Sequence, residues 1–533
     1  MTRTRRTTLA MLALALAASG LMTSARAADQ PLSAQELRGK RIYVEGEAES
    51  GVPITAVVAR GATPIPASIL PCAGCHGEDG KGRPEGGVVP PDITWQTLSA
   101  AYGHEHDYGR RHPAFDENSL ARAVILGNDP AGNPLDAVMP RYDMPAAEMA
   151  DLVAYLKRIG DDLDPGLTAD SIRVGSILPA SGELAGLGRA MQNVLEASFA
   201  DINASGGIHG RQLELVALDA GGEPGENLWQ VRDQLREGSI FALLGGYAEG
   251  ADGELAALAE EEEIPMIGLF TQSPRAGNGL ERHGFYLTGG LAEQARVALR
   301  RALDESADQR DAVIGIVHLA GPAYSEVVRQ LQKDLAGRRM PAPLVISYQP
   351  PFLDKVDLVN TLRSRGAHTV VFMAPVDELK RFVAEAARQD FAPTLLLPGV
   401  FAGQPMFELD RTFGGRVLVA YPSIPGDHTA DGVRDFEALH AQHGFGYEYS
   451  TAQISAFVAA RVFAEGLKRA GRALSREKLL VALEGISDYR AGLMPPISYN
   501  RSRRIGAYGG YVIELDTAEG KFGATSNWIG LEL

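Results

Sequence analysis

The sequence Cys72-Ala73-Gly74-Cys75-His76 determines how the first part of this 533-residue chain must fold. Its two cysteines are the only two in the chain, which excludes a four-cysteine zinc site and a structural disulfide elsewhere. A Cys-x-x-Cys-His run is the attachment site of a c-type haem, whose vinyl groups take up both thiols. We therefore expect one covalent haem c on Cys72 and Cys75, with His76 as an axial ligand of the iron.

A redox-active dithiol of the thioredoxin kind is the competing interpretation of the two cysteines. That interpretation requires a βαβ context and no histidine directly after the second cysteine. Neither condition holds in this stretch.

The N-terminus has the pattern of a secretory signal. Basic residues at the start are followed by an apolar stretch at 9–18 and by Ala25-Arg26-Ala27, a small-x-small cleavage site. The alternative, a membrane anchor, is disfavoured because the apolar stretch is too short to span about 30 Å of hydrocarbon. Arg5-Arg6 also permits a twin-arginine signal, although haem c is attached after export and an unfolded-chain route suits that better. We expect residues 1–27 to be a cleaved signal peptide and the mature chain to lie in the periplasm without a transmembrane segment.

The chain is acidic. Loss of residues 1–27 takes the formal charge from −16 to −20, because four arginines and no acid leave with them. This excess argues against nucleic acid and anionic lipid as partners. It suits solubility or a basic partner protein.

Residues 28–160 contain two expected helices around the haem motif. The first covers Leu37 to Gly46 and the second Ala147 to Ile159, with apolar residues at helical spacing in the second. Between them lie Gly- and Pro-rich segments that need a haem to complete a core. This stretch resembles the class I cytochrome c family, and the resemblance implies a small all-α cytochrome c domain that transfers electrons.

The resemblance also implies which residue is the second axial ligand of the iron. It further implies which carbonyl holds the first axial ligand, His76, by a hydrogen bond. Class I cytochromes use a methionine of a Met-Pro pair before the last helix, and Met139-Pro140 stands there. Met144-Pro145 is a competitor, but Pro145 suits the start of the helix better, and a histidine or no ligand remains a further alternative. In the family a proline carbonyl accepts a hydrogen bond from the proximal histidine; Pro91 matches that position, with Pro90 as an alternative.

Two features depart from the family pattern. Residues 47–70 form an insertion before the haem motif, and Tyr102 to Pro113 carries His104, His106 and His112 beside acids and arginines. A surface metal site is one interpretation of this histidine segment. A solvated polar loop is the preferred one.

Residues 161–170 form a polar stretch with residues that interrupt helices and strands, and we interpret it as a linker. From 171 to 533 strands and helices alternate, which predicts parallel sheets with right-handed crossovers. The pattern restarts near residue 311, so we expect two similar lobes. The expected strands lie at 172–178, 213–218, 241–244, 312–318, 345–348, 369–374, 394–397, 416–421 and 511–515.

The second stretch resembles the leucine/isoleucine/valine-binding branch of the type I periplasmic solute-binding proteins. The segments Pro179 to Gly182, Asp201 to Gly210, Leu243 to Gly246 and Ile264 to Gly268 carry the resemblance. It implies a multidomain chain in which the cytochrome domain precedes a two-lobed α/β domain that binds a small molecule between its lobes.

The family grips a ligand carboxylate with two loops of the first lobe, here Tyr247 to Gly250 and Phe270 to Ser273. Tyr247 and Thr271 fit that role, whereas Glu249 replaces an expected serine and would repel a carboxylate. Tyr324 matches an aromatic position of the second lobe. No acid stands at Pro398 to Val400 to pair with a ligand ammonium. Either the match between this sequence and the family pattern is shifted by a residue or two, or the ligand is not an α-amino acid. We favour the second explanation, a different ligand.

These observations favour an electron carrier fused to a solute-binding module, with a periplasmic dehydrogenase, cytochrome or oxidase as its redox partner. The alternative is the substrate-binding component of an ABC-type uptake system with an accessory haem domain and an ABC permease as partner. Catalysis at the haem is disfavoured because His76 and Met139 fill both axial positions, so we expect no enzymatic activity.

Overall fold

The computed structural model describes residues 32–58, 63–82, 88–106, 109–221, 227–237, 239–247, 250–275, 281–305, 312–349 and 354–532. The chain forms two compact units, Met1–Asp164 and Pro165–Leu533. The expected signal peptide and Glu249 lie outside the described residues. Within the described ranges no helix is long and apolar enough to cross a membrane.

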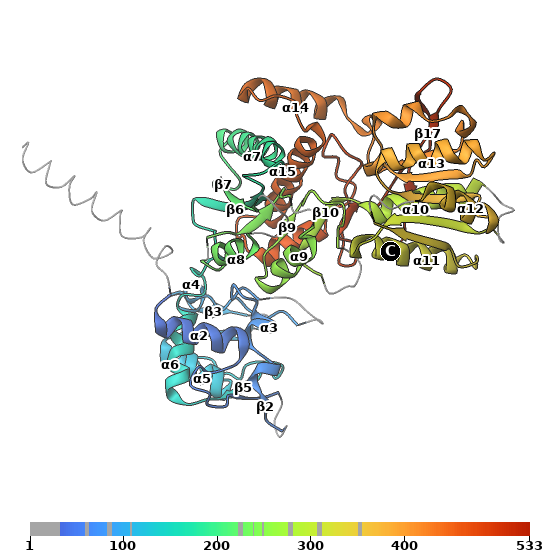
Figure 1. Ribbon diagram of the computed structural model, residues 1–533. Helices are drawn as coiled ribbons and strands as arrows, with labels where there is room; N and C mark the ends of the chain where they lie inside the picture. The colour runs from blue at the N-terminus through green and yellow to red at the C-terminus, as the bar shows by residue number, and fades with distance from the viewer. Residues whose placement is uncertain are drawn as a thin grey trace, which may run out of the picture. The chain divides into compact units, whose positions relative to one another are not determined.

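The first unit is built around two packed helices, α2 (Ala34–Glu45) and α6 (Ala146–Leu156). Ser33 caps α2 and forms a capping box with Glu36, and Gly46 ends the helix in the left-handed conformation. Pro145 is the N-cap of α6 rather than its first helical residue. Both expected helices are present, and Figure 1 shows them side by side.

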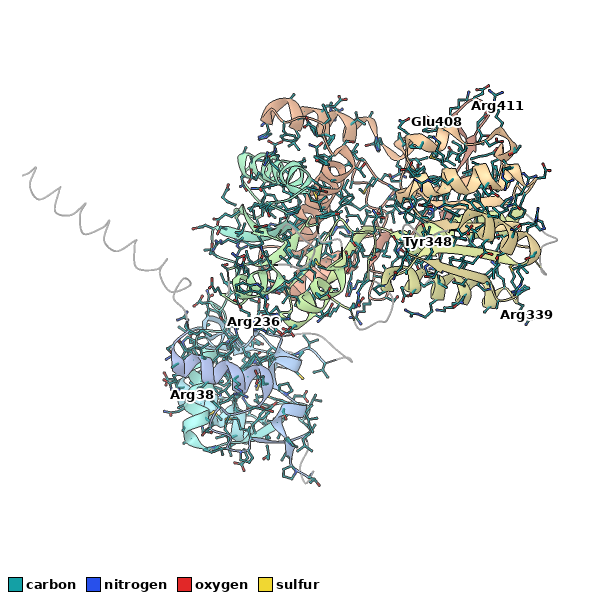
Figure 2. All side chains as sticks on the ribbon, in the orientation of Figure 1. Arg38, Arg236, Arg339, Tyr348, Glu408 and Arg411 are labelled. Atoms are coloured by element: carbon teal, nitrogen blue, oxygen red, sulfur yellow. The ribbon has the colours of Figure 1, made fainter. Side chains whose placement is uncertain are left out.

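Close approach of these helices depends on a glycine. A Cβ on Gly39 would lie 2.0 Å from the carbonyl oxygen of Asp151 on α6. Arg38 holds the same Asp151 by two hydrogen bonds of 2.7 and 3.1 Å between guanidinium and carboxylate. Figure 2 labels Arg38 on α2.

The first unit also contains short strands that the sequence did not indicate. The 47–70 insertion supplies β1 (Thr55–Val57) and β2 (Ile65–Pro66), and β1 pairs antiparallel with β5 (Arg141–Asp143). A second ribbon joins β3 (His104–Glu105) to β4 (Arg111–His112). The remaining helices of the unit are α3 (Cys72–His76), α4 (Trp95–Leu98) and α5 (Glu117–Leu126).

The first lobe of the second unit is a parallel six-stranded sheet in the order β16-β10-β9-β8-β6-β7. Its strands are β6 (Ser171–Leu178), β7 (Gln212–Asp219), β8 (Ala242–Leu244), β9 (Met266–Ile267), β10 (Gly284–Thr288) and β16 (Ile505–Ala507). Its early helices are α7 (Ala185–Ala204), α8 (Leu228–Arg236) and α9 (Asp252–Glu261).

The second lobe holds a mixed sheet in the order β12-β11-β13-β14-β15-β17-β18, with β19 also on β17. The strands are β11 (Ile314–Leu319), β12 (Leu344–Tyr348), β13 (Thr369–Met373), β14 (Thr394–Pro398), β15 (Val417–Tyr421), β17 (Gly509–Asp516), β18 (Lys521–Thr525) and β19 (Ile529–Gly530). Strands β11 to β15 are parallel as expected, while β17 to β19 are antiparallel additions. Its helices are α10 (Leu291–Glu305), α11 (Pro322–Gly337), α12 (Lys355–Ser364) and α13 (Val376–Arg388).

Neither lobe is continuous in sequence. Helices α14 (Ala430–His443), α15 (Ser450–Ala470) and α16 (Arg476–Glu484) come after the strands of the second lobe, yet α15 packs on α7, β8, β9 and β10. In Figure 1 the late-chain colour of α15 accordingly lies among the early strands. The predicted two-lobed α/β class is confirmed, and the lobes are interleaved rather than consecutive.

Candidate functional site

The haem motif folds as the short helix α3. Pro71 precedes it with extended backbone, and Gly77 ends it at a φ of 73°. Cys72 is half-buried, Cys75 is exposed and His76 is 9% exposed. The hydroxyl of the buried Tyr43 on α2 donates 2.6 Å to the carbonyl of Gly77, which fixes the helix end to the core.

The His76 imidazole is held from its Nδ1 side. Nδ1 lies 3.2 Å from the Pro91 carbonyl oxygen, so Nδ1 carries the proton and Nε2 keeps its lone pair. Burial lowers the pKa of His76, while the Pro91 hydrogen bond opposes that shift. His76 is therefore neutral at physiological pH, which is the form that binds a metal.

The thiols do not have the character of a redox-active dithiol. Burial raises the pKa of Cys72 to about 11, although a hydrogen bond with Tyr142 acts in the opposite direction. Catalytic dithiols need a lowered thiol pKa, because the thiolate is the nucleophile. The Cys72 environment accordingly disfavours a thioredoxin-like function.

The loop that ends in Met139 is fixed close to the haem motif. The Arg141 guanidinium donates to the carbonyls of Met139, Leu135 and Asp136, the last two at 3.2 Å. The Tyr142 hydroxyl donates 2.6 Å to the carbonyl of Leu70, two residues before Cys72. Pairing of β5 with β1 holds the same segment from its other side.

The two candidate methionines differ in their surroundings. Met144 is 8% exposed and belongs to the apolar core that contains Tyr43, Leu152 and Tyr155. Met139 is only half-buried and lies in the loop clamped by Arg141. Met144 thus packs in the core, whereas Met139 lies in a loop that the Arg141 guanidinium holds through its carbonyls.

The residues around the motif fit a haem. Four large apolar side chains of this unit lie exposed within three sequence positions of Cys72, Pro91 or Met139. They are Ile69 at 63%, Val88 at 37%, Val89 at 74% and Val138 at 48%. A porphyrin face would cover such side chains, and the donor set of two thiols, an imidazole and a thioether suits haem iron.

The histidine segment is not the solvated loop that we preferred. His104 and His112 pair across the β3–β4 ribbon, and His112 is 6% exposed. His106 Nε2 lies 2.8 Å from His112 Nε2. Among the described residues, however, no three His, Cys, Asp or Glu side chains already converge on a metal position.

In the second unit, the two loops expected to grip a carboxylate are adjacent. Tyr247 and Phe270 form a parallel bridge, and their ring centroids lie 6.0 Å apart. The Thr271 hydroxyl donates to the carboxylate of Asp252 and accepts 2.9 Å from the amide of Ser273. Thr271 is therefore engaged by a buried carboxylate, in the place where the resemblance implies a ligand carboxylate.

The second lobe presents aromatic rings at the carboxyl ends of its parallel strands. Tyr324, at the start of α11, stacks between His318 and Phe401, with centroid distances of 6.3 and 6.4 Å. His318 lies near the end of β11, and Phe401 follows β14. Ligands of open α/β sheets bind at this edge.

Tyr348 ends β12 at the same edge and is labelled in Figure 2. It is 7% exposed, and its hydroxyl has no hydrogen-bond partner among the described residues. Burial raises its pKa above the ordinary value of 10.0, so the hydroxyl stays protonated and offers one donor.

Sequence reasoning missed four of these residues: Asp252, His318, Tyr348 and Phe401. A signal existed for three of them, because each aromatic follows or ends an expected strand of the second lobe. Asp252 gave no comparable signal, since its contact with Thr271 joins segments 19 residues apart.

The fold and the two sites define a two-lobed solute-binding protein that carries a cytochrome at its N-terminus. The family profile described as "Periplasmic binding protein" matches residues 171–521, and the chain belongs to that family. A second profile, described as "Cytochrome c", matches residues 59–160. The match implies that the first unit binds haem c and transfers electrons.

Similar proteins agree with this assignment. "Leu/Ile/Val-binding protein homolog 7" of Brucella abortus is 23% identical over 233 residues, which cover 42% of this chain and 58% of the relative. The chain thus spans under two thirds of that relative's length. A "Leu/Ile/Val-binding protein homolog 8" of the same species is 24% identical over 235 residues, covering 43% of this chain and 58% of the relative.

Two solved structures share the fold of the second unit. A fatty acid ABC transporter substrate-binding protein from Thermomonospora curvata has a TM-score of 0.51 and 16% identity, over 70% of this chain and 95% of its own. A branched-chain amino acid ABC transporter protein from Thermus thermophilus with bound valine has a TM-score of 0.51 and 17% identity, over 68% and 97%.

Proposed function

We propose that this protein is a periplasmic electron carrier with one covalent haem c, fused to a module that binds a small solute and recruits a substrate or partner. The hydrogen bond between His76 Nδ1 and the Pro91 carbonyl carries the proposal, because it directs a neutral imidazole toward an iron. Cys72 and Cys75 would attach the group, and His76 and Met139 would bind its iron. When bound, the haem supplies a one-electron oxidation and reduction of its iron.

Two contacts among the described residues hold this arrangement. Pro91 orients His76, while Arg141 fixes the carbonyls of the loop that presents Met139. A thioether is a soft ligand that raises the reduction potential. If His76 and Met139 both bind the iron, the site would favour electron transfer over activation of a small molecule.

The Met139→Ala variant tests this ligand set. We expect the oxidised wild-type protein to show the weak far-red charge-transfer band of a sulfur–iron bond, and we expect Met139→Ala to lose it. Met144→Ala serves as the matched control and should keep the band. Persistence of the band in Met139→Ala, or its loss only in Met144→Ala, would contradict the assignment.

For the second unit we propose a solute other than a free α-amino acid. Asp252 occupies Thr271, and a further carboxylate beside it would be repelled. The aromatic rings offer apolar contact to a solute that has no ammonium group. The Tyr348 hydroxyl offers it a hydrogen-bond donor.

Thermal unfolding of the full-length protein against amino acids, amides and small organic acids tests this part. We expect leucine, isoleucine and valine to leave the melting temperature unchanged, and a neutral or donor-bearing compound to raise it. In Asp252→Asn, acids should bind more tightly than in wild type. Stabilisation of the wild-type protein by valine would contradict the proposal.

Uptake through an ABC permease is the second candidate function. The two similar solved structures are proteins of ABC transporters, which favours it. The neighbouring genes separate the two: a permease cassette supports uptake, whereas a periplasmic dehydrogenase supports electron transfer.

A further inference from the structure

Three imidazoles of the first unit lie on one face of the β3–β4 ribbon. His104 and His106 are two residues apart on one side, and His112 is the cross-strand partner of His104. Alternation along a strand puts positions i and i+2 on the same face. Glu105 and Arg111, the other cross-strand pair, form an ion pair of 2.7 Å.

Two of the three ring separations match those of a three-histidine metal site. The ring centroids are 5.0 Å apart for His106 and His112, 5.1 Å for His104 and His112, and 6.0 Å for His104 and His106. With metal–nitrogen bonds of about 2.0–2.1 Å and tetrahedral angles, three imidazoles place their centroids about 5 Å apart. Only the His104–His106 separation has to shorten.

On two of the three rings, a hydrogen bond to a backbone carbonyl leaves only the other nitrogen with a lone pair for a metal. His112 Nδ1 lies 2.8 Å from the Pro113 carbonyl, which leaves Nε2 with its lone pair. His104 Nε2 lies 2.7 Å from the Thr97 carbonyl, which leaves Nδ1. A carbonyl partner on the second nitrogen is typical of metal-ligating histidines, because it fixes the ring and its tautomer.

We propose that His104 Nδ1, His106 Nε2 and His112 Nε2 bind one divalent late transition ion of the zinc or copper kind. Imidazole nitrogen suits these ions better than magnesium or calcium. On binding, the hydrogen bond between His106 and His112 is replaced by two metal bonds. The proton on His106 Nε2 moves to Nδ1, so the ligand stays neutral.

The surrounding charge permits a cation. The guanidinium of Arg110 is neutralised by Asp129, at 3.1 Å, and the Asp129 side chain is fully buried. Phe115 packs edge-on against His112 at a ring-centroid distance of 5.0 Å.

Zinc binding to the full-length haem protein, purified without a histidine tag and stripped with a chelator, tests the proposal. We expect one zinc per chain by elemental analysis, counted separately from the haem iron. His106→Gln and His104→Gln should each weaken zinc binding at least about tenfold. His443→Gln, which changes an exposed histidine of the second unit, is the control and should bind zinc as wild type does.

Two further measurements separate a loss of the site from a loss of the fold. The haem spectrum of each variant should be unchanged, which also shows that none of these histidines ligates the haem iron. Zinc should raise the melting temperature of the first unit in wild type but not in His106→Gln. Absence of bound zinc in wild type, or zinc retained at equal affinity in both variants, would overturn the proposal.

Discussion

At the residue scale, His440 shows how one buried ring ties stability to pH. His440 lies on α14 with 3% exposure and stacks on Tyr447 at a centroid distance of 4.1 Å. Its Nδ1 lies 3.2 Å from the carbonyl of Phe445, and its Nε2 is buried without a hydrogen-bond partner among the described residues. A second proton would leave a charged N–H group unsatisfied, so burial lowers the pKa below the ordinary 6.5.

This geometry predicts the direction of the pH dependence. Above pH 6.5 the ring is neutral in both the folded and the unfolded state, so its contribution to stability is fully present. As the pH falls below 6.5, the unfolded state binds the proton first, and the free energy of unfolding decreases. Urea unfolding followed by tryptophan fluorescence at several pH values measures this slope.

His440→Phe keeps a ring for stacking and removes the titration, so its slope below pH 6.5 should be shallower than that of wild type. His443→Gln, on the exposed side of the same helix, is the matched control and should retain more of the slope. Equal slopes in wild type and His440→Phe would contradict this account.

The same scale shows what the sequence could and could not predict about the sites. The resemblance to cytochromes was enough to expect the Pro91 contact with His76, because the family places a proline carbonyl at that position. Asp252 could not be expected in contact with Thr271, because a hydroxyl and a carboxylate of separate loops meet only after the sheet forms.

At the scale of elements, the pair α2 and α6 organises the first unit. Helical spacing of apolar residues predicted α6, and the expected residues are buried: Met149, Leu152, Val153, Leu156 and, just beyond the helix, Ile159. Glu148 and Tyr155 are buried as well. The β1 and β2 strands were not predicted, because strands of three and two residues are shorter than any window in which alternation is visible.

Gly39→Ala is expected to separate the two helices. The new Cβ would overlap the Asp151 carbonyl, which belongs to backbone and cannot rotate away. Overpacking of this kind costs about 1–3 kcal/mol in the free energy of unfolding. Urea unfolding followed by haem absorbance measures the first unit alone.

Gly160→Ala is the control in the same unit, because its nearest new contacts are ordinary ones, 3.4 Å from the Thr94 side chain. Its unfolding midpoint should stay close to that of wild type. A Gly39→Ala protein as stable as Gly160→Ala would show that the helices tolerate a wider separation.

At the scale of the whole molecule, the chain joins a cytochrome c domain to a periplasmic binding protein domain. The change from Gly- and Pro-rich segments to a regular α/β alternation was enough to predict two kinds of unit. The interleaving of the lobes was not predicted, since α15 is apolar on most of its surface and its sequence does not say which sheet it covers. Only the tertiary contacts of α15 assign it to the first lobe.

The mass of the denatured full-length protein, made in cells that attach haem to c-type cytochromes, tests the central claim most directly. The account predicts a polypeptide mass increased by one haem, with the added mass on the peptide that contains Cys72 to His76. The Cys72→Ala, Cys75→Ala double variant should lose that mass. A wild-type chain with the unmodified polypeptide mass under the same conditions would contradict the claim that this protein is a haem c electron carrier.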